Sequence, residues 1–118
     1  MQTEPPSVQV DLTPEFRRNL RNLSKKYRQI RSDIQPVIEQ IQAGNFLGDQ
    51  IAGIGYTVLK LRVKNSDIQK GKSGGYRLIY QVESPTSVLL ITIYSKLDQE
   101  DISANQIRDI LAEVQEDS

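Results

Sequence analysis

The sequence predicts an α+β domain, a small antiparallel sheet with two N-terminal helices packed on one face, in the order βααβββα. In two early segments, 13–27 and 30–42, apolar residues recur every three or four positions, as on one face of a helix. After residue 56, three segments of alternating or continuous apolar character follow, as in strands. A chain of 118 residues is long enough for one core and short for two. Residues 1–118 are therefore expected to form a single domain.

The first strand and helix are predicted near the N-terminus. Residues 1–6 are polar with two prolines and are predicted to be disordered, whereas residues 8–12 alternate as a half-buried strand does. Thr13 then offers an N-cap hydroxyl directly before Pro14 at the first helical position. The helix that follows has an apolar stripe of Phe16, Leu20, Leu23 and Tyr27. Its other face is basic and comprises Arg17, Arg18, Arg21, Lys25 and Lys26.

A second helix is predicted before the strands. Its helical spacing is carried by Ile30, Ile34, Val37, Ile38 and Ile41. Pro36 lies inside this pattern and allows a late start, a kink or a break, of which we prefer a start near Ser32 or Asp33. Gly44 and Asn45 would form a left-handed C-terminal cap. Residues 44–57 have four glycines and no clear period, so they are predicted to be a loop.

Three strands and a last helix complete the predicted order. Residues 57–64 put three apolar side chains on one face and the cations Lys60, Arg62 and Lys64 on the other. Because both early helices pack on one face of the sheet, the opposite face is expected to be free and to expose these cations. Residues 76–82 form the next strand, and residues 88–94 form a nearly all-apolar strand with a central place in the sheet. Tyr76 and Tyr80 are expected in the core, although one strand tyrosine could instead stack on a base. Residues 101–118 form an acidic helix, capped by Asp101 or Ser103.

The composition excludes several classes of function. The chain has no cysteine and no histidine, so it lacks disulfides, thiolate and imidazole metal ligands, and a cysteine nucleophile. The longest apolar run, 87–94, is far shorter than the ~20 residues of a membrane span, and the N-terminus shows no secretory pattern. A cytoplasmic protein is expected, without a membrane partner.

The zero net charge hides a separation of charge along the chain. Residues 1–96 carry 14 basic and 8 acidic residues, whereas residues 97–118 carry one basic and seven acidic residues. In the basic part, residues 60–77 hold six cations against Asp67 alone. Such a patch indicates a phosphate-bearing partner such as nucleic acid. The plainer alternative is the solvated face of a strand, protected by charge against aggregation.

A family resemblance rests on the segment 70–80, Lys-Gly-Lys-Ser-Gly-Gly-Tyr-Arg-Leu-Ile-Tyr. It is followed by an apolar strand that ends in Ile93-Tyr94-Ser95-Lys96 and by the acidic stretch Glu100-Asp101-Ile102. This arrangement resembles the RelE/ParE toxin superfamily, and within it the HigB-like branch of bacterial type II toxin-antitoxin systems. The order βααβββα agrees with a RelE-like fold from about residue 8 onward.

The resemblance implies a small cytoplasmic toxin that enters the ribosomal A site and cuts messenger RNA, an mRNA interferase that inhibits translation. A cognate antitoxin protein holds it inactive, and family members need no metal or other cofactor. In the implied reaction a ribose 2′-hydroxyl attacks the adjacent phosphate, which requires a base, a leaving-group acid and stabilising cations. Without histidine, proton transfer is expected from a lysine among like charges, which favour its neutral form: Lys60, Lys70 or Lys72.

The resemblance also assigns residues to the site. Arg77 matches the arginine after the family's glycines and is expected to bind the scissile phosphate through two guanidinium nitrogens. Lys60 and Arg62 correspond to basic residues that grip the RNA backbone and help proton transfer. Some relatives have a second catalytic arginine and a further tyrosine after the last strand, and here Lys96 and Tyr94 are the candidates to replace them. The other cations predicted to bind RNA are Lys64, Lys70 and Lys72.

Two other functions stay open at this point. A ParE-like relative would inhibit DNA gyrase by contact and cut nothing, and a degenerate toxin would bind only its antitoxin. The antitoxin is expected to supply an apolar or acidic segment that covers the cationic face or the free helix surface. The acidic C-terminal helix could instead lie near that face and neutralise it.

Overall fold

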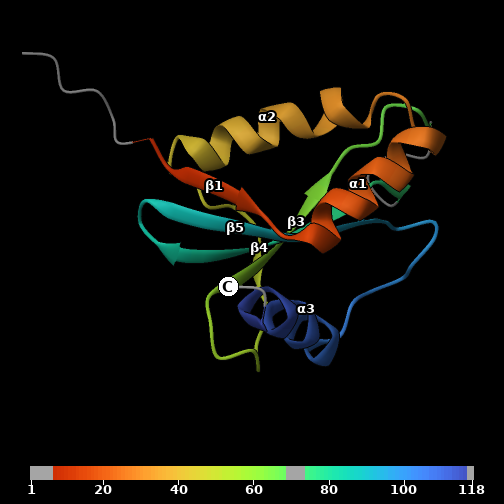
Figure 1. Ribbon diagram of the computed structural model, residues 1–118. Helices are drawn as coiled ribbons and strands as arrows, with labels where there is room; N and C mark the ends of the chain where they lie inside the picture. The colour runs from red at the N-terminus through yellow and green to blue at the C-terminus, as the bar shows by residue number, and fades with distance from the viewer. Residues whose placement is uncertain (1–6, 69–73, 117–118) are drawn as a thin grey trace, which may run out of the picture.

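The predicted fold class is confirmed by a computed structural model, which describes residues 7–68 and 74–116 (Figure 1). The elements are β1 (Gln9–Leu12), α1 (Pro14–Lys26), α2 (Ile30–Gln42), β2 (Asp49–Gln50), β3 (Val58–Val63), β4 (Tyr76–Ser84), β5 (Ser87–Ser95) and α3 (Ala104–Glu116). The order βααβββα is found, with the two-residue β2 added inside the loop predicted for 44–57. The predictions for residues 1–6, Lys70 and Lys72 lie outside the described residues.

The five strands form one sheet in the order β1-β5-β4-β3-β2. Four of them are antiparallel neighbours, but β1 pairs with β5 in parallel, with Gln9 opposite Ser87. The sheet is therefore mixed rather than wholly antiparallel as predicted. Parallel pairing requires a long connection between the two strands, and here residues 13–86 form it. β5 has a strand on each side, which agrees with its continuous apolar sequence.

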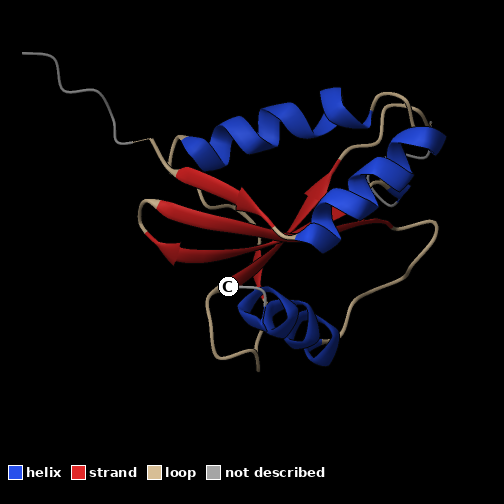
Figure 2. Cartoon of the chain, viewed as in Figure 1, coloured by secondary structure: helices blue, strands red, loops and turns tan. Residues whose placement is uncertain are grey.

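Helices α1 and α2 cover one face of the sheet, as predicted (Figure 2). The N-cap of α1 is Thr13, whose Oγ1 accepts a hydrogen bond from the Phe16 N–H at 2.9 Å. Phe16 packs with Tyr76 and Tyr80 in the core beneath the helices, and all three side chains are fully buried. The expectation that these two tyrosines belong to the core is confirmed.

The predicted start of α2 is wrong. The helix begins at Ile30, before Ser32, and no side chain caps it. The Asp33 carboxylate accepts hydrogen bonds from the N–H and hydroxyl of Ser66 instead, at 2.9 and 3.1 Å. Pro36 lies inside the helix, at its seventh residue. Burial of the apolar stripe against the sheet therefore outweighs the local signals for a later start.

The opposite sheet face is not free, contrary to prediction, because α3 packs against it (Figure 1). Ile107 and Leu111 of α3 join Val58, Ile79 and Ile91 in a second core. The predicted cap Ser103 is the one used. Its Oγ accepts from the Gln106 N–H at 3.1 Å, and the Gln106 side chain accepts from the Ser103 N–H at 2.8 Å. Among the described residues, no helix is long and apolar enough to span a membrane.

Candidate functional site

Three of the predicted site residues stand side by side on the sheet. In the strand register Arg62 of β3 lies opposite Arg77 of β4, and Arg77 lies opposite Tyr94 of β5. Directly opposed residues project from the same face, so these three side chains form a row across the sheet, here called the arginine row. Lys60, two residues before Arg62, projects from the same face. This is the face that α3 partly covers.

Arg77 is the most deeply placed cation of the row, with 7% of its surface exposed. Within residues 7–68 and 74–116, its guanidinium donates one hydrogen bond, to the Tyr76 carbonyl at 3.2 Å. In the part of the chain that the structure describes, no carboxylate lies within 4.0 Å of it. A guanidinium has five N–H donors, and a buried charge is favourable only when it is paired. Arg77 is therefore suited to bind an anion that enters this face.

Glycine 75 fixes the start of the strand that carries Arg77. A Cβ built on Gly75 would collide with the Val63 carbonyl oxygen, so only glycine allows β4 to begin this close to the end of β3. On the other side, the Gly75 carbonyl accepts from the Lys96 N–H at 2.9 Å. The ends of β3, β4 and β5, with the row on them, are thereby held together.

Tyr94 lies beside Arg77, with 6% of its surface exposed. Its hydroxyl donates to Asp101 Oδ1 at 3.4 Å. Burial raises the pKa of Tyr94 to about 12, and the Asp101 charge acts in the same direction while Arg77 opposes it. The phenol thus keeps its proton at neutral pH and can donate it, but it is no base there.

Asp101 was considered from the sequence as a helix cap and as part of an acidic stretch, not as a site residue, yet it reaches the site. Its Oδ1 accepts from Lys60 Nζ at 3.3 Å and from the Ile102 N–H at 2.8 Å. The Ile102 N–H first, and then Lys60, hold the pKa of Asp101 below its ordinary value. The charged group beside Lys60 is therefore a carboxylate. The expected role of Lys60 in proton transfer relied instead on neighbouring cations.

The remaining predicted cations are more scattered. Lys96 follows β5, and its Nζ donates to the Glu100 carbonyl within the turn that leads to Asp101. Arg62 and Lys64 are exposed, and no described carboxylate lies within 4.0 Å of either. The structure thus brings Lys60, Arg62, Arg77 and Tyr94 onto one face, with Lys64 and Lys96 near the strand ends.

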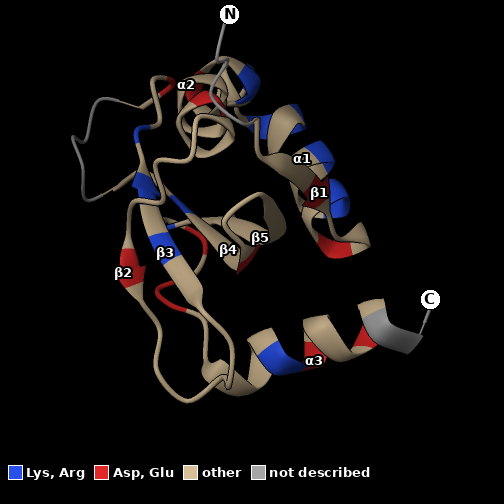
Figure 3. Cartoon of the chain, turned by 90° about the vertical axis from the view of Figure 1, so that its left-hand side faces the viewer, with Lys and Arg blue, Asp and Glu red and all other residues tan. Residues whose placement is uncertain are grey.

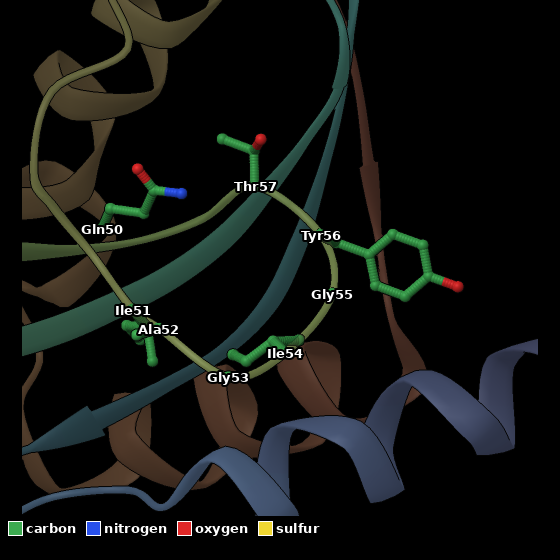
Figure 4. Close-up of a pocket in the computed structure, with 8 residues that line it drawn as sticks. All are labelled: Gln50, Ile51, Ala52, Gly53, Ile54, Gly55, Tyr56 and Thr57. Carbon is green, nitrogen blue, oxygen red and sulfur yellow. The ribbon is translucent and has the colours of Figure 1, made fainter.

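One hollow lies away from this row. It has a volume of about 360 Å³ and is formed by the loop 50–57, whose lining contains no charged side chain (Figure 4). A smaller cleft of about 250 Å³ lies between β5 and α3 and is lined by Thr92, Tyr94, Gln99 and Gln106 among others. Tyr94 also lines a third cleft, of about 200 Å³, between α1 and the end of β5, so two of these three hollows share that residue with the arginine row.

A second basic region was predicted from the sequence only as the outer face of the first helix and not as a candidate binding site. Residues 17–31 contain seven cations and no acidic residue. All seven are exposed, most of them along α1, as the blue segments in Figure 3 show. A count of charged residues in successive segments of the sequence would have singled out residues 17–31 as well. The sequence pattern was interpreted instead as the ordinary solvated face of a helix.

Chemically, the arginine row offers a buried guanidinium for an anion, an exposed one beside it and a phenol that can donate a proton. Such a set fits a phosphodiester better than a neutral substrate. No known protein-family model matches the chain.

Proposed function

We propose that the chain is the toxin of a type II toxin-antitoxin system, a ribosome-dependent endoribonuclease that cuts messenger RNA in the cytoplasm without a cofactor. The resemblance of segment 70–80 to HigB-like toxins suggests the class. One observation supports the arginine row as the site of cleavage. Arg77 is nearly buried, has no described carboxylate partner, and lies between Arg62 and Tyr94 on one sheet face.

In the proposed reaction the ribose 2′-oxygen forms a bond to the adjacent phosphorus, and the bond from phosphorus to the 5′-oxygen breaks. The products are a 2′,3′-cyclic phosphate and a free 5′-hydroxyl. Arg77 neutralises the charge that grows on the phosphate oxygens, and Arg62 holds the neighbouring backbone. Tyr94, whose pKa is raised to about 12, supplies the proton that the leaving 5′-oxygen takes up. Lys60 is the candidate to take up the proton of the 2′-hydroxyl.

Binding of RNA requires a rearrangement at Lys60. In the structure its ammonium group lies 3.3 Å from the Asp101 carboxylate, which also accepts from Tyr94. A phosphate that enters the row competes with this carboxylate for the same two donors. Asp101 therefore opposes RNA binding until the turn from Lys96 to Asp101 moves.

The test is cleavage of a defined messenger in a purified translation system, with and without stalled ribosomes. The Arg77→Ala variant should lose about 10²-fold in rate, as expected when one donor to the transition state is removed. Arg108→Ala, an arginine of α3 outside the row, is the matched control and should keep the native rate. Unchanged cleavage by Arg77→Ala removes Arg77 from the mechanism.

Absence of cleavage by the native chain overturns the ribonuclease proposal. A gyrase supercoiling assay then examines the ParE-like alternative, in which the chain inhibits gyrase and cuts no RNA. Co-purification with the protein encoded beside it tests the proposed antitoxin partner.

A further inference from the structure

The outer face of α1 carries a line of cations that the arginine row does not use (Figure 3). Arg17, Arg21 and Lys25 follow one another at intervals of four residues, so they lie on one side of the helix with a rise of about 6 Å between them. All three are exposed, and no described carboxylate lies within 4.0 Å of any of them. We call these three residues the α1 stripe.

The residues around the stripe add charge of the same sign. Arg28 and Arg31, in the turn after α1 and at the start of α2, are exposed as well. Two cations at the margin are paired: Arg18 with Glu15 at 2.8 Å, and Lys26 with Asp98 at 3.0 Å. Both carboxylates lie outside residues 17–31, and neither lies within 4.0 Å of a residue of the α1 stripe.

Stability alone does not account for this face. Like charges at an interval of four residues repel each other along a helix and destabilise it. Surfaces that serve only solubility mix both signs of charge. A face with cations alone is therefore expected to meet an anionic partner.

We propose that the α1 stripe docks the phosphodiester backbone of duplex RNA, at a place separate from Arg77. The rise of about 6 Å between cations is of the order of the separation between successive phosphates in a strand. Phe16, the aromatic residue of α1, is buried, so this face offers no ring on which a single-stranded base could stack. This face is therefore suited to contact the backbone of a duplex, and such contact does not depend on the base sequence.

The position of the stripe supports RNA as the source of the phosphates. The bond from Lys26 Nζ to Asp98 joins the end of α1 to the turn after β5, which follows Tyr94 and holds Lys96. Because α1 and the arginine row lie on opposite faces of the sheet, an RNA that reaches both passes around this edge of the sheet. The choice of RNA rests on the proposed function, whereas docking of a phosphate backbone does not.

The test measures binding of the full-length chain to a fluorescent 20-base-pair RNA duplex by anisotropy at several salt concentrations. The variant carries Arg17→Gln, Arg21→Gln and Lys25→Gln. It should bind about tenfold or more weakly at low salt, and the slope of log affinity against log salt should flatten by about one for each cation removed. A matched control makes the same change in net charge at exposed positions elsewhere: Gln42→Glu, Gln50→Glu and Ala112→Glu.

The outcomes are separable from those of the cleavage assay. Equal affinity and slope for the stripe variant and the control overturn the docking proposal, as does a native chain that binds no duplex. Equal binding of a DNA duplex, with the same loss in the stripe variant, overturns the assignment to RNA. Because this assay measures binding and not cleavage, a native chain that cuts no messenger can still support docking. Circular dichroism confirms that each variant is folded.

Discussion

Replacing Asp101 with asparagine should strengthen RNA binding at the arginine row. In the native chain Asp101 Oδ1 accepts from Lys60 Nζ at 3.3 Å and from the Tyr94 hydroxyl at 3.4 Å. Asparagine has nearly the same shape and keeps an oxygen that can accept from the Ile102 N–H, but it carries no charge. Lys60 is then released for a phosphate without first leaving a carboxylate.

The expected magnitude follows from the geometry and exposure of this pair. Two unit charges 3.3 Å apart attract each other by about 1.3 kcal/mol in water. The side chains of Lys60 and Asp101 are 31% and 64% exposed, so solvent screening applies, and pairs of this kind contribute about 0–1 kcal/mol. Removing a competitor of up to about 1 kcal/mol should raise the affinity for RNA by up to about fivefold.

The assay is anisotropy with a short single-stranded RNA that cannot be cut because its 2′-hydroxyls are methylated. Asp98→Asn is the matched control, since it removes a carboxylate of the same turn that pairs with Lys26 rather than Lys60. An Asp101→Asn variant that binds more weakly than the native chain would refute the reasoning, because Asp101 would then help to hold the RNA.

Two further predictions concern stability. Gly75→Ala should destabilise the fold by about 1–3 kcal/mol, because its Cβ would meet a β3 carbonyl that cannot move freely. In the same urea titration Gly44→Ala isolates a different cost, about 1 kcal/mol, because its Cβ would meet nothing within 4 Å and only its φ of +89° strains alanine. Burial raises the pKa of Tyr80 to about 12, above the ordinary value of 10.0, so its stabilising contribution is complete below pH 10 and is lost as the pH rises to about 12. Tyr80→Phe should therefore lose less stability between pH 9 and 11 than the native chain does, and the exposed Tyr56→Phe should behave as native; a native loss in Tyr80→Phe would contradict this assignment.

The sequence allowed the elements to be predicted where local pattern and burial agree. The Thr13-Pro14 start of α1 and the apolar β5 are of this kind, because each signal is carried by neighbouring residues. The start of α2 was missed because Asp33, a good cap by type, bonds to Ser66 across the fold. The parallel pairing of β1 with β5 depends on the tertiary path of the chain, which no local pattern contains.

The candidate site could be predicted only in part for a similar reason. Alternation along β3 placed Lys60 and Arg62 on one face, and the register then put Arg77 and Tyr94 next to them. The role of Asp101 was not foreseeable, because its contacts with Lys60 and Tyr94 depend on the path of the turn after β5. The expected free face was wrong because the amphipathic pattern of α3 does not say which surface it covers.

The hydrogen bond from Thr13 makes the first helix, α1, depend on the last strand, β5. Its hydroxyl caps α1 and also donates to the Ile91 carbonyl at 2.6 Å, across 78 positions of the chain, and β1 beside it pairs only with β5. A growing chain that has not yet produced β5 thus has no partner for its first strand and no lock on its first helix. Folding should therefore proceed through long-range closure, at the slow rate that high contact order brings. During synthesis the domain therefore stays incompletely folded until β5 has been synthesised, although the residues of its basic N-terminal helices have already been added to the chain.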